Sequence, residues 1–170
     1  MHIQNLKMNP YHKGGSVEKE IETLDLKGYK ETIPPVNKGT LTLDRDLIFV
    51  ARTQRGYEFE YDPNFEWGCS PTETLLMSLA GCLAIDVVSF LRKMRAEITN
   101  FKINASGERN PIPPQYYKSI EMVIDISGKG ITPKKMDKAI ALSQEKYCSV
   151  YHSLRKDIKV DVKYNITNED

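Results

Sequence analysis

The sequence predicts an α+β fold in which antiparallel sheets surround one central, buried, cysteine-bearing helix, in the order βββ-α-ββ-αα-β. Residues 71–94 form a long apolar helical segment, and segments that alternate apolar and polar residues lie on both sides of it. A second helical segment follows at 132–147. Of the 170 residues 40% are hydrophobic, which is enough for one domain with a sizeable core.

Charge and composition argue against several classes of function. The formal net charge is +1, so nothing favours nucleic acid or an anionic membrane as partner. Residues 1–14 lack the apolar segment of a signal peptide, and the central helix contains Asp86, which favours a buried helix over a membrane span. Three cysteines do not form a disulfide scaffold. These features predict a soluble, cytoplasmic protein.

The elements before the central helix are a polar extension and a group of strands. Residues 1–38 are predicted to be an N-terminal extension, with a short helix between Ser16 and Gly28, and residues 39–170 to be the domain. The first strands are expected to form an antiparallel meander. They are predicted at 40–43, 47–52 and 57–61.

The central helix has a strong start signal. Ser70 is an N-cap residue, Pro71 occupies the first helical position and Glu73 the third, which is the capping-box arrangement. The elements predicted after this helix are strands at 98–107 and 119–127, a helix at 132–147, a short helix at 150–156 and a strand at 158–164.

Two cysteines are candidates for chemistry. Cys82 lies in the middle of the apolar helix, beside Gly81, where a second backbone could approach closely. It is either an inert packing residue, as buried cysteines usually are, or a reactive group. Cys148 is expected at a helix start, where the backbone N–H groups and the helix dipole lower the pKa of a thiol. A second thiol on another element makes a peroxidatic and resolving pair possible.

Each of these cysteines lies in a recognisable motif. One runs from Ser70 to Cys82 and continues with Asp86-Val87-Val88, and the other runs from Glu145 to Val150. They resemble the first and second cysteine motifs of the OsmC/Ohr family and, within it, those of the YhfA-like branch. The resemblance covers about residues 38–166. It implies an OsmC-like fold, an intertwined homodimer with the cysteine helices at its centre, and a thiol-dependent peroxidase without metal or other cofactor.

The resemblance also implies a role for each cysteine. Cys82 would be the peroxidatic residue, which a peroxide oxidises to a sulfenic acid, and Cys148 the resolving residue, which condenses with it to a disulfide. A dithiol reductant would then reopen the disulfide. An apolar pocket around Cys82 would favour organic hydroperoxides as substrates. The alternatives are a redox-sensing or ligand-binding dimer of the same fold with little peroxidase turnover, and a structural protein with packing cysteines.

Active members of the family use an arginine from the early strands and a glutamate at the helix start. Arg45 is the leading candidate for the arginine, ahead of Arg52 and Arg55, and Glu73 is the candidate for the acid. Glu73 stands one position from the expected spacing, and nine helical residues place it opposite Cys82 and about 13 Å away along the axis. It therefore either only caps its own helix or serves the other subunit.

Three further side chains are relevant to the thiols. Asp86 lies one turn beyond Cys82 on the same helix face, and we interpret it as a structural ion-pair or interface residue, because a buried carboxylate needs a partner or a proton. Cys69 is separated from Cys82 by roughly 18 Å of helix, too far for a disulfide. His152 shares a helix face with Cys148, but too few ligands accompany it for a zinc site.

Overall fold

The computed structural model describes residues 26–169. Most of the predicted N-terminal extension, including the helix expected from Ser16, lies outside these residues. The described chain forms two compact units, Gly28–Ser78 and the segment from Leu79 onward. The elements follow the predicted order βββ-α-ββ-αα-β, with a π-helical turn inserted between the last two α-helices.

The unit Gly28–Ser78 contains a three-stranded antiparallel sheet in the order β1-β2-β3. Its strands are β1 (Gly39–Arg45), β2 (Ile48–Thr53) and β3 (Glu58–Tyr61), so the predicted meander is confirmed. Every residue of β1 is exposed, including Leu41 and Leu43. This sheet therefore presents apolar side chains on its surface.

Helix α2 (Pro71–Lys93) begins where the capping signal predicts. The Ser70 N–H donates to Glu73 Oε2 at 2.7 Å, and the Glu73 N–H donates to Ser70 Oγ at 3.2 Å, which completes the capping box. Within residues 26–169, α2 is the one helix whose length and hydropathy would suffice for a membrane span, a property that the core helix of a soluble protein shares. Its buried residues are Leu79, Ala80, Leu83, Asp86, Val87, Phe90 and Leu91.

The unit from Leu79 onward contains a second sheet in the order β4-β5-β6. Its strands are β4 (Glu97–Arg109), β5 (Tyr117–Lys129) and β6 (Lys159–Asn168). Strands β4 and β5 are antiparallel, but β6 runs parallel to β5, so the prediction of purely antiparallel sheets is wrong for the last strand. The reason is the helical crossover between β5 and β6, which returns the chain to the end of the sheet at which β5 begins.

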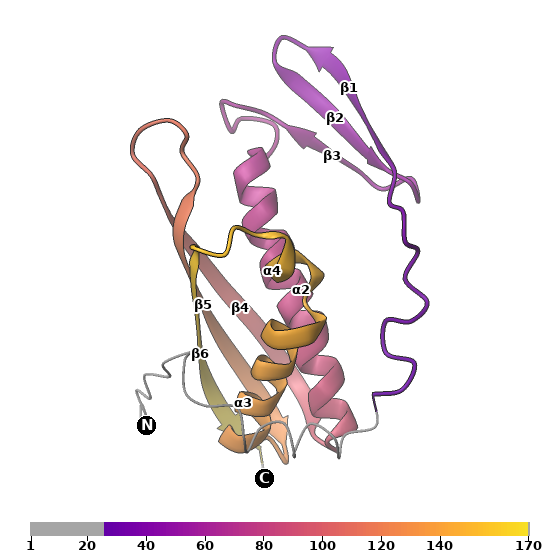
Figure 1. Ribbon diagram of the computed structural model, residues 1–170, viewed down its shortest axis with the longest axis vertical. Coiled ribbons are helices and arrows are strands. Elements are labelled where there is room, and N and C mark those ends of the chain that lie inside the picture. Colours follow the sequence, from indigo (N-terminus) through magenta and orange to yellow (C-terminus); the bar gives the residue numbers. More distant parts are fainter. Residues whose placement is uncertain (1–25, 170) are drawn as a thin grey trace. The chain divides into compact units, whose positions relative to one another are not determined.

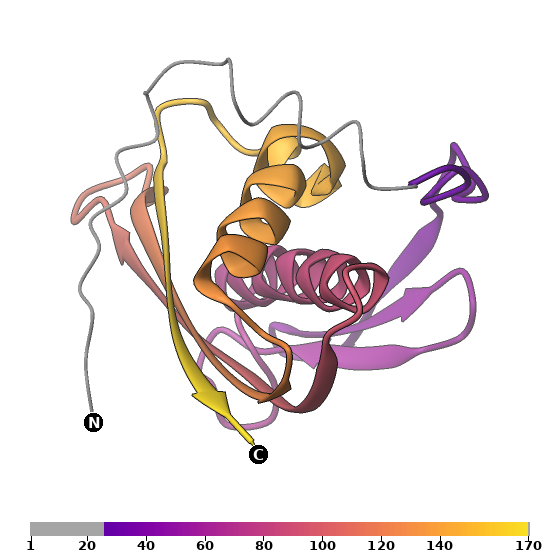
Figure 2. The same cartoon turned by 90° about the horizontal axis from the view of Figure 1, so that it is seen from below.

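The crossover consists of α3 (Pro133–Leu142), the π-helical turn η1 (Ser143–Tyr147) and α4 (Ser149–Ser153). Together with the C-terminal part of α2, these helices cover one face of the second sheet (Figures 1 and 2). The short helix predicted at 150–156 corresponds to α4, which spans 149–153. The sheet contributes alternate residues of β5 to the core beneath them, namely Ile120, Met122, Ile124 and Ile126.

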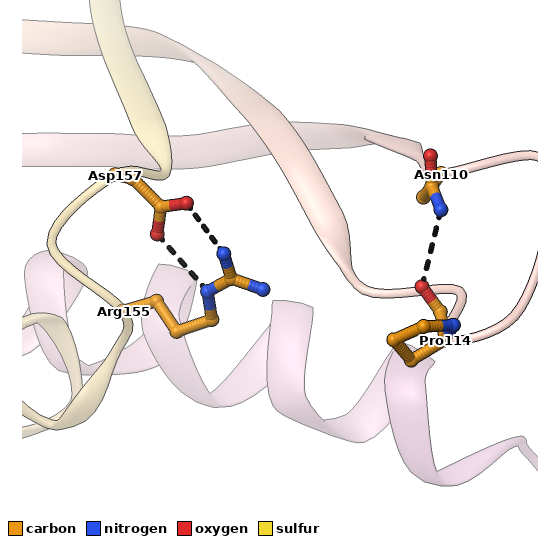
Figure 3. Close-up of polar contacts among 4 residues, drawn as sticks. All are labelled: Asn110, Pro114, Arg155 and Asp157. Atoms are coloured by element: carbon orange, nitrogen blue, oxygen red, sulfur yellow. Dashed lines mark hydrogen bonds and ion pairs between the residues drawn. The ribbon is translucent and has the colours of Figure 1, made fainter.

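Two loops at one end of this sheet are fixed by polar contacts. Arg155, between α4 and β6, binds the Asp157 carboxylate through two nitrogens, at 3.0 and 2.5 Å (Figure 3). Its guanidinium also lies 4.1 Å from the ring centre of Tyr116. In the loop between β4 and β5, the Asn110 side-chain amide donates to the Pro114 carbonyl oxygen at 3.4 Å (Figure 3). The stacking on Tyr116 connects the end of the helical crossover to the start of β5.

Candidate active site

Two thiols and one carboxylate meet inside the unit from Leu79 onward. The sulfur atoms of Cys82 and Cys148 and a carboxylate oxygen of Asp86 all lie within 4.8 Å of one another. Cys82 and Asp86 come from successive turns of α2, and Cys148 comes from the junction of η1 and α4. Residues 66 positions apart in the sequence are thus adjacent in space, and both cysteines are free thiols.

The π-helical turn places Cys148 in this group. The Cys148 N–H donates to the Ser143 carbonyl oxygen at 2.8 Å, a bond across five residues that widens the helix by one residue in its last turn. Cys148 itself is extended, with φ −77° and ψ 95°, so the chain changes direction there and α4 begins at the next residue. Such π-helical turns often occur at functional sites.

The two thiols differ in their access to solvent. Cys148 is 1% exposed, whereas Cys82 is only partly buried. Beside Cys82 the helix surface is open, because Gly81 is exposed and no atom lies within 4 Å of the position that a Cβ would take there. A small molecule can therefore reach Cys82 more readily than Cys148.

The thiol of Cys148 is held in its neutral form. Burial, followed by its hydrogen bond with Cys82, raises its pKa to about 12, and the negative charge of Asp86 acts in the same direction. The Tyr151 N–H, which donates to Cys148 Sγ at 3.4 Å, lowers the pKa by less than burial raises it. The predicted lowering at the helix start is therefore wrong: α4 has five residues, and desolvation outweighs its N-terminus.

Asp86 is completely enclosed by its own chain. It is 0% exposed, and its Oδ2 accepts a hydrogen bond from Ser143 Oγ at 2.8 Å. The interpretation of Asp86 as an interface residue is therefore wrong, because no surface of the side chain is left for a second subunit. Ser143 is not among the site residues that the sequence predicts. It follows Met136 by seven residues and Ile140 by three, so it lies in line with two buried residues of the same helix, and this position is the available signal for a buried polar contact.

The arginine and the glutamate expected at the site both have local partners in the unit Gly28–Ser78. Arg45 forms an ion pair with Asp44, and its guanidinium lies 5.8 Å from the ring centre of Trp67. Glu73 makes the capping box with Ser70 described above. Capping is thus one role of Glu73, and a role of either residue at Cys82 remains a prediction.

Cys69 and His152, the other side chains considered in relation to the thiols, each have contacts of their own. Cys69 donates a weak hydrogen bond from its sulfur to the Glu60 carbonyl oxygen at 3.6 Å. His152 is exposed, and its ring packs against that of Tyr151 at 5.7 Å. The group around Cys148 thus offers two sulfurs and one carboxylate, one ligand fewer than a closed structural zinc site requires.

Comparison with known proteins identifies the family of this fold and site. The family model described as OsmC-like protein matches residues 63–163, which include both cysteines. The chain belongs to the OsmC-like family. Protein YhfA of Escherichia coli K12 is 31% identical over 121 residues, which are 71% of this chain and 90% of YhfA. The resemblance found in the two cysteine motifs is therefore confirmed at the level of the family.

Solved structures of other proteins share the fold. A hypothetical protein from Aquifex aeolicus VF5 is 28% identical, with a TM-score of 0.73 over 81% of this chain and 100% of that one. The organic hydroperoxide resistance protein OhrB of Bacillus subtilis is 16% identical, with a TM-score of 0.53 over 76% of this chain and 98% of that one. The likeness to OhrB is one of fold. The predicted OsmC-like α+β fold around a cysteine-bearing helix is thus confirmed.

Proposed function

We propose that this protein is a thiol-dependent peroxidase that reduces organic hydroperoxides through Cys82 and Cys148. The observation that carries the proposal is the pairing of a partly accessible thiol with an enclosed one, their sulfurs within 4.8 Å. A disulfide requires a sulfur–sulfur distance of about 2 Å, so small side-chain movements suffice to form the bond. OhrB of Bacillus subtilis, an organic hydroperoxide resistance protein of the same fold, supports the substrate class.

The reaction has two oxidative steps and one reductive step. The thiolate of Cys82 attacks the peroxide oxygen, the O–O bond breaks, and the alkoxide takes a proton and leaves as an alcohol. Cys82 is now a sulfenic acid, oxidised by two electrons. The Cys148 sulfur attacks the Cys82 sulfur and water leaves, which yields a disulfide. A dithiol reductant returns both thiols by exchange and becomes a disulfide itself.

Accessibility assigns the two roles. The residue that meets the peroxide must be reachable, which favours Cys82, and the resolving residue needs only to reach the Cys82 sulfur, which Cys148 can do from its buried position. The exposed surface next to Cys82 is apolar, since Ile85 lies one turn away and is 63% exposed. An alkyl or aryl hydroperoxide gains burial energy on such a surface, which hydrogen peroxide does not.

Arg45 and Glu73 belong to the proposal as the pair that would stabilise the Cys82 thiolate. An arginine beside a thiol lowers its pKa, and a carboxylate can orient the guanidinium. Glu73 cannot approach Cys82 within one helix, so this pair would act from the partner subunit.

A stoichiometric oxidation tests the proposal. Reduced protein treated with one equivalent of cumene hydroperoxide should form a disulfide between Cys82 and Cys148, which peptide mapping by mass spectrometry identifies as the loss of two hydrogens. Cys69 should stay reduced and serves as the internal control. Three free thiols after the treatment would contradict the proposal. A disulfide that forms once, without continued consumption when dihydrolipoamide is supplied, would instead favour the redox-sensing alternative.

We also propose that the protein works as a homodimer. Met77, Gly81 and Ile85 are exposed at four-residue intervals along α2. In the sheet β1-β2-β3, Leu41 and Leu43 are exposed on β1. Exposed apolar rows such as each of these are typical of an interface. The open side of α2 would then face the second subunit, so that in the dimer Cys82 would receive its substrate at the edge of the subunit interface.

Analytical ultracentrifugation tests the homodimer. At micromolar concentration the sedimenting species should have twice the 19.4 kDa mass of the chain. Ile85→Arg places a charge on the exposed side of α2 and should shift the species toward the monomer. Ile112→Arg is the matched control, because Ile112 is 67% exposed in the loop between β4 and β5. A wild-type species of 19.4 kDa would rule the dimer out.

A further inference from the structure

We infer that Asp86 is the proton-transfer group of the disulfide-forming step: its carboxylate takes the proton of the Cys148 thiol and gives it to the hydroxyl group that leaves Cys82. The inference rests on the proposed function and extends it to a residue that the peroxidase chemistry above does not use.

The disulfide-forming step needs a base because the resolving thiol is neutral. Only the thiolate attacks sulfur efficiently. Because burial raises the pKa of Cys148 to about 12, its thiol is almost entirely protonated at pH 7. Bulk water cannot accept this proton, because Cys148 is 1% exposed and solvent does not reach its sulfur. The proton must therefore leave to a group that is buried beside the sulfur.

Asp86 meets the geometric requirements for that base. Its carboxylate oxygen lies within 4.8 Å of both the sulfur that loses a proton and the sulfur that loses a hydroxyl group. The titratable groups gathered around it are Cys82, one turn earlier on α2, and Cys148, from the junction of η1 and α4. A carboxylate has two oxygens and about four acceptor positions, so the bond from Ser143 leaves room for another donor.

Ser143 explains why the carboxylate stays in place. Its hydroxyl donates to Asp86 Oδ2, and its carbonyl oxygen accepts the N–H of Cys148. One residue thereby fixes both the base and the backbone of the thiol that the base serves. Such double support is typical of a proton-transfer group, whose distance to the proton determines the rate.

The step balances without any further oxidant. The Cys148 S–H bond breaks and the proton passes to Asp86, while the sulfur electron pair forms the bond to Cys82. The S–O bond of the sulfenic acid breaks, and the departing hydroxide takes the proton from Asp86 and leaves as water. The Asp86 carboxylate is regenerated. The condensation needs no external electrons, because the two-electron oxidation that the peroxide made at Cys82 is shared between the two sulfurs of the disulfide.

Asp86→Asn tests the inference, because an amide keeps the size and the hydrogen bond from Ser143 but cannot carry the proton. In a rapid-quench experiment with one equivalent of cumene hydroperoxide, Cys82 should oxidise at the wild-type rate. Disulfide formation should be slower by about 10²- to 10⁴-fold, the usual contribution of a general base. The sulfenic acid should therefore accumulate, and dimedone should trap it for mass spectrometry.

The direction in which Asp86→Asn changes the rate of disulfide formation distinguishes a base at Asp86 from a residue that acts only through its charge. The negative charge of Asp86 raises the pKa of Cys148, so its removal alone would ease ionisation and speed the disulfide step. A rate equal to or above that of the wild type would overturn the inference. The pH profile gives a second readout: in Asp86→Asn the rate should rise about tenfold per pH unit, because the free thiolate must form first, and in the wild type less steeply.

Two controls keep failures distinguishable. Ser143→Ala removes the support but not the carboxylate, so its disulfide step should slow less than that of Asp86→Asn. If Asp86→Asn does not fold, the wild-type protein alone decides the question. A rate of disulfide formation that rises tenfold per pH unit contradicts the inference. A rate that rises less steeply with pH and is lower in D₂O than in H₂O supports it. If wild-type Cys82 forms no sulfenic acid, the proposed function itself fails. If only the Asp86→Asn result disagrees, the proposed function stands.

Discussion

Cys82→Ser is expected to abolish the turnover of organic hydroperoxide. A serine hydroxyl does not ionise at neutral pH and is not oxidised by peroxide, so neither the sulfenic acid nor the disulfide can form. Removal of a nucleophile that every later step requires costs on the order of 10⁴-fold or more in enzymes. Steady-state consumption of cumene hydroperoxide, with dihydrolipoamide as reductant, measures the loss.

Two variants serve as controls for this result. Cys69→Ser should retain the wild-type rate, because its sulfur contacts the Glu60 carbonyl and takes no part in the proposed chemistry. In Cys148→Ser, one equivalent of peroxide should still oxidise Cys82, but the disulfide between residues 82 and 148 cannot form. Sluggish consumption that neither Cys82→Ser nor Cys148→Ser alters would mean that the peroxidase proposal is wrong.

The elements of the fold were predictable because their signals are local. The capping sequence from Ser70 to Glu73 placed the start of α2, and apolar–polar alternation together with the turns between segments placed the strands. Each of these signals depends on neighbours within a few residues. The direction of β6 depends instead on how a crossover of nearly thirty residues, from Gly130 to Ile158, returns over the sheet, which no local pattern specifies.

The candidate site was predictable in its thiols and not in its polar surroundings. The two cysteine motifs identified Cys82 and Cys148, and the structure brings their sulfurs together. The π-helical turn that presents Cys148 depends on packing against α2, as does the bond from Ser143 to Asp86. The raised pKa of Cys148 also depends on the assembled core, because burial of the thiol causes it. The helix-start signal, which predicts a lowered pKa, is local in the sequence and does not include this burial.

Phe90→Ala is expected to cause the largest loss of stability among single substitutions in α2. Phe90 is 0% exposed, and its ring lies 5.4 Å from that of Tyr147, the last residue of the π-helical turn. Removal of a buried phenylalanine side chain costs about 3–5 kcal/mol, and the lost aromatic pair is included in that range. Urea unfolding at one fixed protein concentration measures the change in the free energy of unfolding, since association would otherwise contribute.

Ile112→Ala is the control for this measurement and should change the free energy of unfolding by less than about 0.5 kcal/mol, because Ile112 is exposed. A loss below about 1 kcal/mol in Phe90→Ala would contradict the packing of α2 against η1 described above.

The same variant also probes the site, since Tyr147 directly precedes Cys148. Phe90 supplies no proton or electron, so oxidation of Cys82 in the folded variant should stay near the wild-type rate. Disulfide formation should slow, because Cys148 is no longer held firmly beside Cys82.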